Sequence, residues 1–97
     1  MKALKRVEIV VGTLESSKVI KILDDNKIDG YTMIKNVLGR GDKGIKDGEG
    51  LHNAFQNTYI IVACSAEELE SITEPLRTVL TKSGGVCLVS EAQWLVH

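Results

Sequence analysis

A glycine-rich run at residues 38–50 constrains the fold of this chain more than any other feature. Five of the nine glycines in the protein lie there, at positions 39, 41, 44, 48 and 50, among charged side chains. Compact domains usually join their helices and strands with only a handful of residues. Longer connections without a core of their own are usually either functional or disordered. We therefore expect residues 38–57 to form a long loop that is mobile alone, becomes ordered on binding, and uses the rest of the chain as its scaffold.

Two strands and one helix are predicted before this loop. Residues 7–11 are rich in β-branched side chains, which is typical of a strand, and residues 30–37 form a second strand. Between them, Thr13 is a plausible helix N-cap. Asn26 suits the left-handed position after the last helical turn, and Ile28 can fold back as a hydrophobic cap.

A third strand and a second helix follow the loop. Residues 58–64 form a nearly continuous apolar strand, as expected for the centre of a sheet. Ser65 and Glu68 have the spacing of a capping box, which predicts that a helix begins there. Pro75 removes a backbone donor and costs about 3 kcal/mol in a straight helix, so we expect a kink or break at residues 71–74.

The last full strand is predicted at residues 86–90, and residues 94–96 have the composition of a further edge strand. The order of elements indicates an α+β fold, a ferredoxin-like βαββαβ sandwich with strand order 4-1-3-2. In that order the strands of Cys64 and Cys87 are separated by the first strand, about 10 Å apart. A disulfide needs Cα atoms within about 7 Å, so we expect two unbridged, buried thiols.

The sheet face opposite the helices is predicted to be too apolar for water. Large apolar residues occupy both alternating positions of the strands, so burial of one face under the helices leaves apolar residues on the other. Exposed apolar faces of this kind indicate self-association, and a closed ring is the simplest arrangement. The neighbouring pairs are Ile9 and Val10, Ile60 and Ile61, and Leu88 and Val89.

Composition excludes several classes of protein. The chain has 97 residues, which predicts a single domain over residues 1–97. Twelve basic and thirteen acidic side chains give a net charge of -1, so we expect no nucleic-acid partner. No apolar run approaches the roughly 20 residues that span a bilayer, and we expect that residues 1–6 do not begin a signal peptide. We expect a cytoplasmic protein that is not itself a membrane protein.

Catalytic and metal-binding patterns are missing from the sequence. His52 and His97 have no spacing that indicates shared metal ligands, and neither a nucleophile set nor a Walker sequence is present. We therefore predict no metal site, no catalytic residues and no enzymatic activity. The run from Gly39 to Lys43 is more informative, because glycine N–H groups and basic side chains together bind phosphate or carboxylate.

Residues 30–32, 39–40 and 43–44 resemble the start of the T-loop in PII signalling proteins. The order of elements is the same, and the resemblance covers residues 7–96. Residues 84–94 are more similar to a divergent PII-like group, some of whose members serve inorganic-carbon metabolism. The resemblance implies a regulatory homotrimer whose T-loop, residues 38–57, contacts a protein target such as a transporter or an enzyme.

The resemblance also implies an adenine-nucleotide site in each cleft between subunits. Thr32 of the neighbouring subunit and the backbone near Ala63 would contact the nucleotide, the latter at the adenine. Gly84 and Gly85 would form the floor. The residues near the phosphates would be Gly39, Arg40, Gly41 and Lys43.

Three departures from the PII pattern modify these expectations. Val86 stands where PII proteins usually have a phosphate-binding lysine, and the chain has no counterpart of their C-terminal Arg-x-Arg pair. With fewer cations we expect AMP or ADP to bind at least as well as ATP. The loop also lacks the tyrosine that is uridylylated in some PII proteins. Two alternatives remain open at this point: a metal-binding trimer similar to the CutA proteins, and a ligand-free trimeric interaction module.

Overall fold

The computed structural model describes residues 1–39 and 56–97, and the elements in these ranges confirm the α+β prediction. The sheet has four antiparallel strands in the order β2-β3-β1-β4, which is the expected ferredoxin-like order. Most of the loop predicted at 38–57 lies outside the described residues, and β3 begins at residue 57. The elements are β1 (Lys2–Gly12), the 3₁₀ helix η1 (Thr13–Glu15), α1 (Ser16–Asp25), β2 (Tyr31–Val37), β3 (Asn57–Cys64), α3 (Ala66–Ser83) and β4 (Val86–Trp94).

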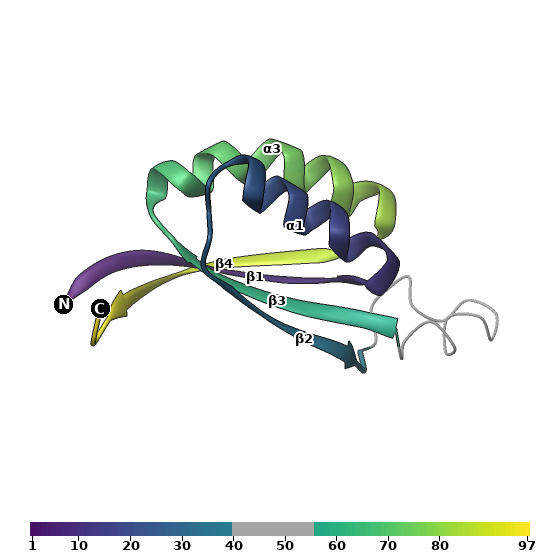
Figure 1. The fold of residues 1–97 in the computed structure, drawn as a ribbon, viewed down its shortest axis with the longest axis horizontal. Coiled ribbons are helices and arrows are strands. Elements are labelled where there is room, and N and C mark those ends of the chain that lie inside the picture. The colour runs from purple at the N-terminus through teal and green to yellow at the C-terminus, as the bar shows by residue number, and fades with distance from the viewer. Residues whose placement is uncertain (40–55) are drawn as a thin grey trace.

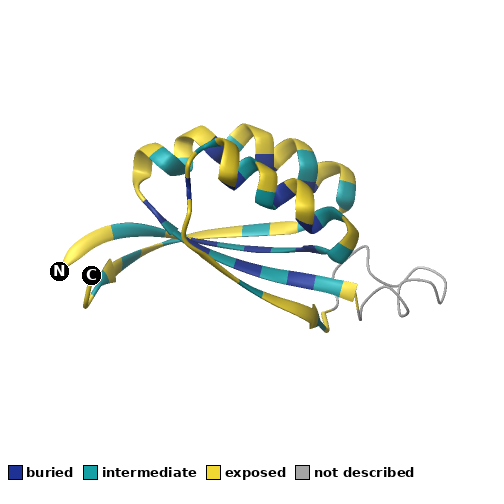
Figure 2. Cartoon of the chain, in the orientation of Figure 1, coloured by how far each residue is buried: buried dark blue, intermediate teal, exposed yellow. Residues whose placement is uncertain are grey.

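Helices α1 and α3 lie side by side on one face of the sheet (Figure 1). Alternate residues of β1 and β3 point toward them, because successive side chains of a strand face opposite sides. Ile9 is paired with Ile60, and Val7 with Val62, and all four are fully buried. The buried positions of strands and helices form one core between the two layers (Figure 2).

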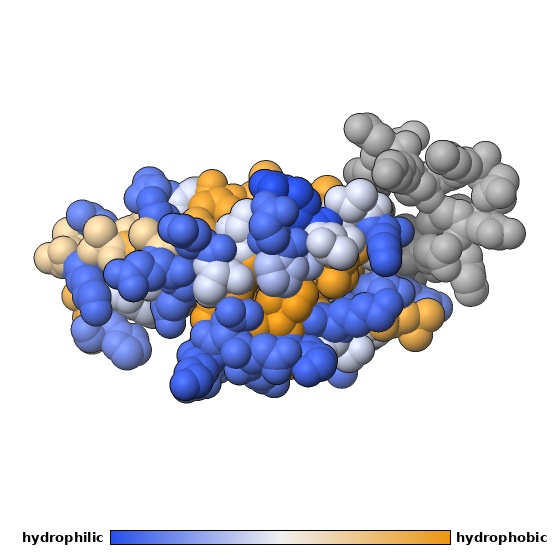
Figure 3. Space-filling model, turned by 90° about the horizontal axis from the view of Figure 1, so that it is seen from above, coloured by the Kyte–Doolittle hydropathy of each residue, from blue (hydrophilic) through white to orange (hydrophobic). Residues whose placement is uncertain are grey.

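The opposite face of the sheet, called the open face below, carries no helix (Figure 1). The register places several large apolar residues on it. Three of them are exposed: Ile34 at 52%, Val86 at 55% and Leu88 at 65%. The helix side, by contrast, presents a largely hydrophilic surface (Figure 3). Among these apolar residues are Leu4, Val10, Ile34, Ile61, Val86 and Leu88.

The start of α1 differs from the prediction that Thr13 is its N-cap. Thr13 begins the short η1 helix, and α1 starts at Ser16 without a side-chain cap. The Thr13 hydroxyl lies 3.0 Å from the hydroxyl of buried Thr58 on β3. The Ser16 hydroxyl donates to the Thr13 carbonyl over 2.7 Å. The N-cap prediction was wrong because a partner on another element takes the Thr13 hydroxyl.

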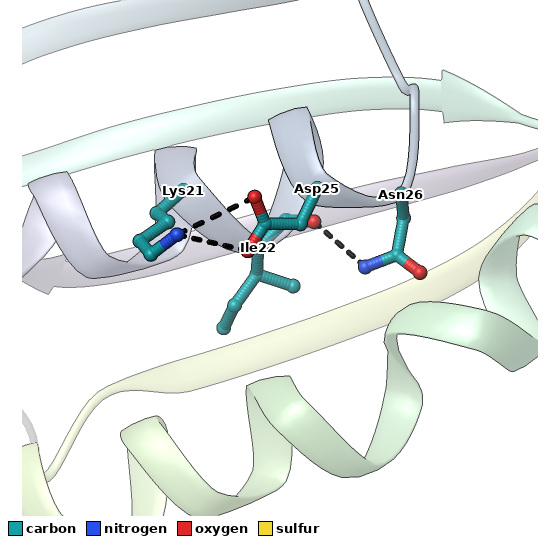
Figure 4. A network of polar contacts seen from close by, with 4 residues as sticks. All are labelled: Lys21, Ile22, Asp25 and Asn26. Atoms are coloured by element: carbon teal, nitrogen blue, oxygen red, sulfur yellow. Dashed lines mark hydrogen bonds and ion pairs between the residues drawn. The ribbon is translucent and has the colours of Figure 1, made fainter.

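The end of α1 is a Schellman motif, displaced by one residue from the prediction. Lys27, rather than Asn26, is left-handed, with φ 60°. The Asn26 amide instead donates to the Ile22 carbonyl over 2.8 Å (Figure 4). The N–H of Ile28 donates to the Leu23 carbonyl over 2.9 Å, and Ile28 is buried. The expected hydrophobic cap by Ile28 is confirmed, whereas the position assigned to Asn26 was wrong.

Helix α3 begins with the predicted capping box. Ser65 Oγ accepts from the Glu68 N–H over 3.1 Å, and the Glu68 carboxylate accepts from the Ser65 N–H over 2.9 Å. A break at residues 71–74 was one of the two predicted outcomes and was wrong, because α3 is continuous through Pro75. The alternative of a kink stays a prediction. The core-facing stripe of α3 is intact on both sides of the proline, at Ile72 and Leu76. Burial of each such side chain stabilises by about 1.5–3 kcal/mol, which offsets the cost of one proline.

The C-terminal strand is longer than predicted. β4 pairs with β1 from the Val10–Val86 pair to the Lys2–Trp94 pair, so Trp94 ends β4 and does not begin a separate edge strand. Cys64 and Cys87 lie on opposite sides of β1 and are both free, as predicted. Neither described helix is long and apolar enough to cross a membrane.

Candidate functional site

Three of the predicted site residues lie at the end of the sheet where the chain leaves β2 and enters β3, called the loop end below. β1 and β2 finish there, and β3 and β4 begin there, because neighbouring strands are antiparallel (Figure 1). The Gly12–Asn57 and Val10–Val86 pairs mark this end of the sheet. Gly39 follows β2, and Gly84 and Gly85 precede β4, so the loop end collects these three glycines.

The two glycines before β4 are required for different reasons. Gly84 ends α3 in the left-handed conformation, with φ 77°, and its N–H donates to the Leu80 carbonyl over 2.9 Å. A Cβ on Gly85 would lie 2.8 Å from Leu80 Cδ2 and 2.9 Å from the carbonyl oxygen of Val10. The chain can therefore turn from α3 into β4 in close contact with β1 only because both side chains are missing.

Strand β2 bends just before it leaves the sheet. The register shifts between Lys35 and Val37, and Asn36 between them is left-handed, with φ 61°. A bulge of this kind changes the direction of the strand and often lies beside a functional site. The sequence analysis missed Asn36, although Asn is among the residues that enter the left-handed region most readily. Gly39, two residues beyond β2, is exposed and has open space around its Cα.

Two other predicted site residues lie at the opposite end of the sheet. Thr32 pairs with Ile61 near the start of β2, and Ala63 pairs with Arg6 near the end of β3. Ala63 is separated from Asn57 by six strand positions, which is about 20 Å at the rise of an extended chain. One chain therefore does not bring Thr32 or Ala63 together with the glycines of the loop end. Arg40, Gly41 and Lys43 lie outside the described residues.

The cation expected beside the glycine turn is replaced by an apolar residue. Val86 is the first residue of β4, it is exposed, and it lies on the open face. Lys82, in the last turn of α3, is the nearest preceding lysine in the chain and is also exposed. An exposed apolar side chain therefore begins β4 directly after the glycine turn.

The described residues contain neither a group of metal ligands nor an activated cysteine. Within 1–39 and 56–97, no three His, Cys, Asp or Glu side chains are grouped so that they could hold a metal ion. Burial raises the pKa of the Cys64 and Cys87 thiols, and Glu68 raises that of Cys64 further. A raised pKa disfavours the thiolate, which is the opposite of what a reactive cysteine requires.

Comparison with known proteins identifies a family and a set of similar structures. The profile of the family described as nitrogen regulatory protein P-II matches residues 4–95. No curated protein matches the chain. Among solved structures, it is similar to CPII, a nitrogen regulatory PII-like protein from Thiomonas intermedia K12, bound to ADP, AMP and bicarbonate. The two share 26% identity with a TM-score of 0.81, over 95% of this chain and 88% of that chain.

Two further structures agree with this result. CPII bound to ADP and bicarbonate has 26% identity and a TM-score of 0.80, again over 95% of this chain and 88% of that chain. A PII-like signalling protein from Thermus thermophilus shares the fold, with 21% identity, a TM-score of 0.74, and coverage of 96% and 90%. The family profile spans all four strands and both described helices. This chain therefore belongs to the P-II family of regulatory proteins, as a divergent PII-like member.

Proposed function

We propose that this protein is a cytoplasmic PII-like regulator that assembles as a homotrimer and binds AMP or ADP between its subunits. The T-loop, residues 38–57, contacts a protein target according to which nucleotide is bound. The observation that carries the proposal is the similarity over 95% of the chain to CPII, whose structure is bound to ADP and AMP.

The positions of the candidate residues support a site shared by two subunits. In one chain, Gly39, Gly84 and Gly85 lie at the loop end, and Thr32 and Ala63 lie at the other end of the sheet. A nucleotide is too short to contact both groups across about 20 Å of strand. The loop end of one subunit against the opposite end of its neighbour would supply both groups to one ligand.

The chemistry of the two groups fits different parts of a nucleotide. Glycines at the loop end leave backbone N–H groups accessible to phosphate oxygens. Arg40 would add a planar guanidinium, which contacts phosphate with two parallel hydrogen bonds. The exposed hydroxyl of Thr32 and the backbone at Ala63 offer hydrogen bonds to the ribose and the adenine.

Charge at the site favours the shorter phosphates. Val86 contributes no cation beside the glycine turn, where a lysine would meet the terminal phosphate. A triphosphate carries more negative charge than a monophosphate and needs more compensation. We therefore expect AMP and ADP to bind at least as tightly as ATP.

Calorimetric titration of AMP, ADP and ATP into the wild type and Arg40→Ala tests this function. We expect the substitution to weaken AMP and ADP binding by about 1.5–3 kcal/mol, the range for a hydrogen bond to a charged group. Lys46→Ala is the matched control. It removes a cation from the same loop, but Lys46 is not among the residues that we propose to contact the phosphates.

Three outcomes would contradict parts of the proposal. Tight ATP binding that Arg40→Ala leaves unchanged would place the phosphates elsewhere. Equal losses in Arg40→Ala and Lys46→Ala would mean that general loop charge, rather than Arg40, attracts the nucleotide. No binding of any of the three nucleotides would favour a trimeric interaction module without a ligand.

A further inference from the structure

A polar cluster lies on the open face among mainly apolar residues. The Tyr59 hydroxyl on β3 donates to Glu8 Oε1 on β1 over 2.8 Å. Arg6 Nε lies 3.5 Å from Glu8 Oε2 and donates to Ser90 Oγ on β4 over 3.1 Å. The polar cluster of Arg6, Glu8, Tyr59 and Ser90 therefore links three neighbouring strands across the face.

Apolar residues lie on the same face around this cluster. Glu8 pairs with Ile61 on one side and with Leu88 on the other. Val10, the next residue of β1 on this face, pairs with Tyr59 and Val86. A cross-strand pair on one face brings its side chains within about 5 Å of each other. The charged side chains of the cluster are thus surrounded by apolar side chains.

The polar cluster contributes little to the stability of the single chain. The Arg6 and Glu8 side chains are 50% and 27% exposed, and ion pairs that water reaches stabilise by only about 0–1 kcal/mol. An apolar pair at these positions would bury more apolar surface. The Arg6–Glu8 ion pair has a larger effect on free energy if a second copy of the chain covers the open face and excludes water.

The bonding of the cluster is suited to such a covered position. Both Glu8 oxygens already have a partner within the chain, and the charges of Glu8 and Arg6 cancel. Arg6 uses only its Nε, since no acceptor among residues 1–39 and 56–97 bonds to its two NH₂ groups. A covered guanidinium needs oxygen partners, so the adjoining copy must present an acceptor or a water at this point.

We propose that the polar cluster fixes the register of the copies that pack on the open face, and with it their number. This inference rests on the proposed trimer and adds the residues that select it. Apolar contact between copies is non-directional and tolerates several packings. Burial of Arg6 next to a paired Glu8 allows only the packings that satisfy the remaining Arg6 donors.

Two variants of the full chain separate the contribution of the polar cluster from that of apolar contact. Native mass spectrometry and light scattering measure the number of copies in each assembly. Glu8→Gln keeps the side-chain shape and leaves Arg6 uncompensated, so we expect the dissociation constant of the assembly to rise by at least about tenfold. In a triple variant, Arg6→Met, Glu8→Leu and Tyr59→Phe replace both charges and the phenol of the cluster by apolar side chains. We expect this variant to associate at least as tightly as the wild type, but as a mixture of copy numbers.

Asp25→Asn is the control, because it breaks the exposed Lys21–Asp25 pair on α1, away from the open face (Figure 4). It should leave both affinity and copy number unchanged. A wild-type trimer together with a triple variant of the same single copy number would overturn this inference alone. Wild-type affinity in Glu8→Gln would do the same. A monomeric wild type would overturn the proposed trimer as well.

Discussion

Gly85 lies directly against the carbonyl of Val10, at 2.9 Å from the position that a Cβ would occupy. This contact joins the turn before β4 to the last residues of β1 at the loop end. The turn can therefore keep this close packing only while position 85 carries no side chain. The same side chain of Leu80 that limits Gly85 also belongs to the core, at 2.8 Å from that position.

Gly85→Ala should destabilise the folded chain by about 1–3 kcal/mol, the usual cost of overpacking. The backbone carbonyl of Val10 cannot rotate away from the added methyl group. Urea denaturation measures the loss as a change in the free energy of unfolding. Gly30→Ala is the control, because a Cβ there meets no atom within 4 Å. Equal stability of Gly85→Ala and the wild type would show that β1 and the turn are not in close contact.

Local signals in the sequence were sufficient for the order of the four strands and the two α-helices. The Ser65–Glu68 capping box and the apolar strands were predicted correctly, because these patterns depend on neighbours in the chain. The predictions at Thr13 and Asn26 failed for different reasons. Thr13 has a partner on β3 that only the tertiary structure supplies, and Asn26 uses its amide on the Ile22 carbonyl.

Lys27→Gly should stabilise the chain by about 0.5–1 kcal/mol. Lys27 has φ 60°, where a Cβ costs about 1–2 kcal/mol, and part of this gain is lost because glycine is freer in the unfolded state. Thermal unfolding of the variant measures the effect. Lys18→Gly, inside α1, is the matched control and should destabilise by about 1 kcal/mol. Loss of stability in Lys27→Gly would contradict the Schellman geometry.

Removal of Glu8 should lower the pKa of Tyr59. The hydrogen bond to Glu8 raises the pKa of the Tyr59 phenol above its ordinary value, with burial and the Glu8 charge acting in the same direction. The stability that this bond contributes is therefore complete below the pKa of the unfolded phenol. It is lost as the pH rises through the higher pKa of the folded state.

Phenolate absorbance in a Tyr31→Phe background reports Tyr59 alone, since the chain has two tyrosines. We expect the titration to move to lower pH when Glu8→Ala is added. An unchanged midpoint would mean that Glu8 does not hold the Tyr59 hydroxyl in solution.

Leu88→Glu should give a folded chain that no longer assembles. Leu88 is exposed on the open face, so the charge costs the single chain little but must be desolvated when another copy covers the face. Light scattering coupled to size exclusion measures the assembly. Leu14→Glu is the control, because Leu14 is equally apolar and 84% exposed but lies in η1. An assembly unaffected by Leu88→Glu would mean that the open face is not the contact between copies.

The candidate site was less accessible to sequence reasoning than the fold. Gly84 and Gly85 were identified through the family resemblance, and the structure gives each a physical reason to be glycine. The separation of Thr32 and Ala63 from these glycines follows from the antiparallel order of the strands, which places the start of β2 and the end of β3 at the opposite end of the sheet. Asn36 was missed because its bulge interrupts a segment whose composition is that of an ordinary strand.

Native mass spectrometry of the full chain, titrated with AMP, tests most directly whether adenine nucleotide binds between copies of the chain. We predict a species with the mass of three chains that takes up AMP in steps to three molecules, while any residual monomer stays unbound. AMP on the monomer would contradict a site shared by two subunits. A trimer that takes up neither AMP nor ADP would contradict nucleotide binding itself.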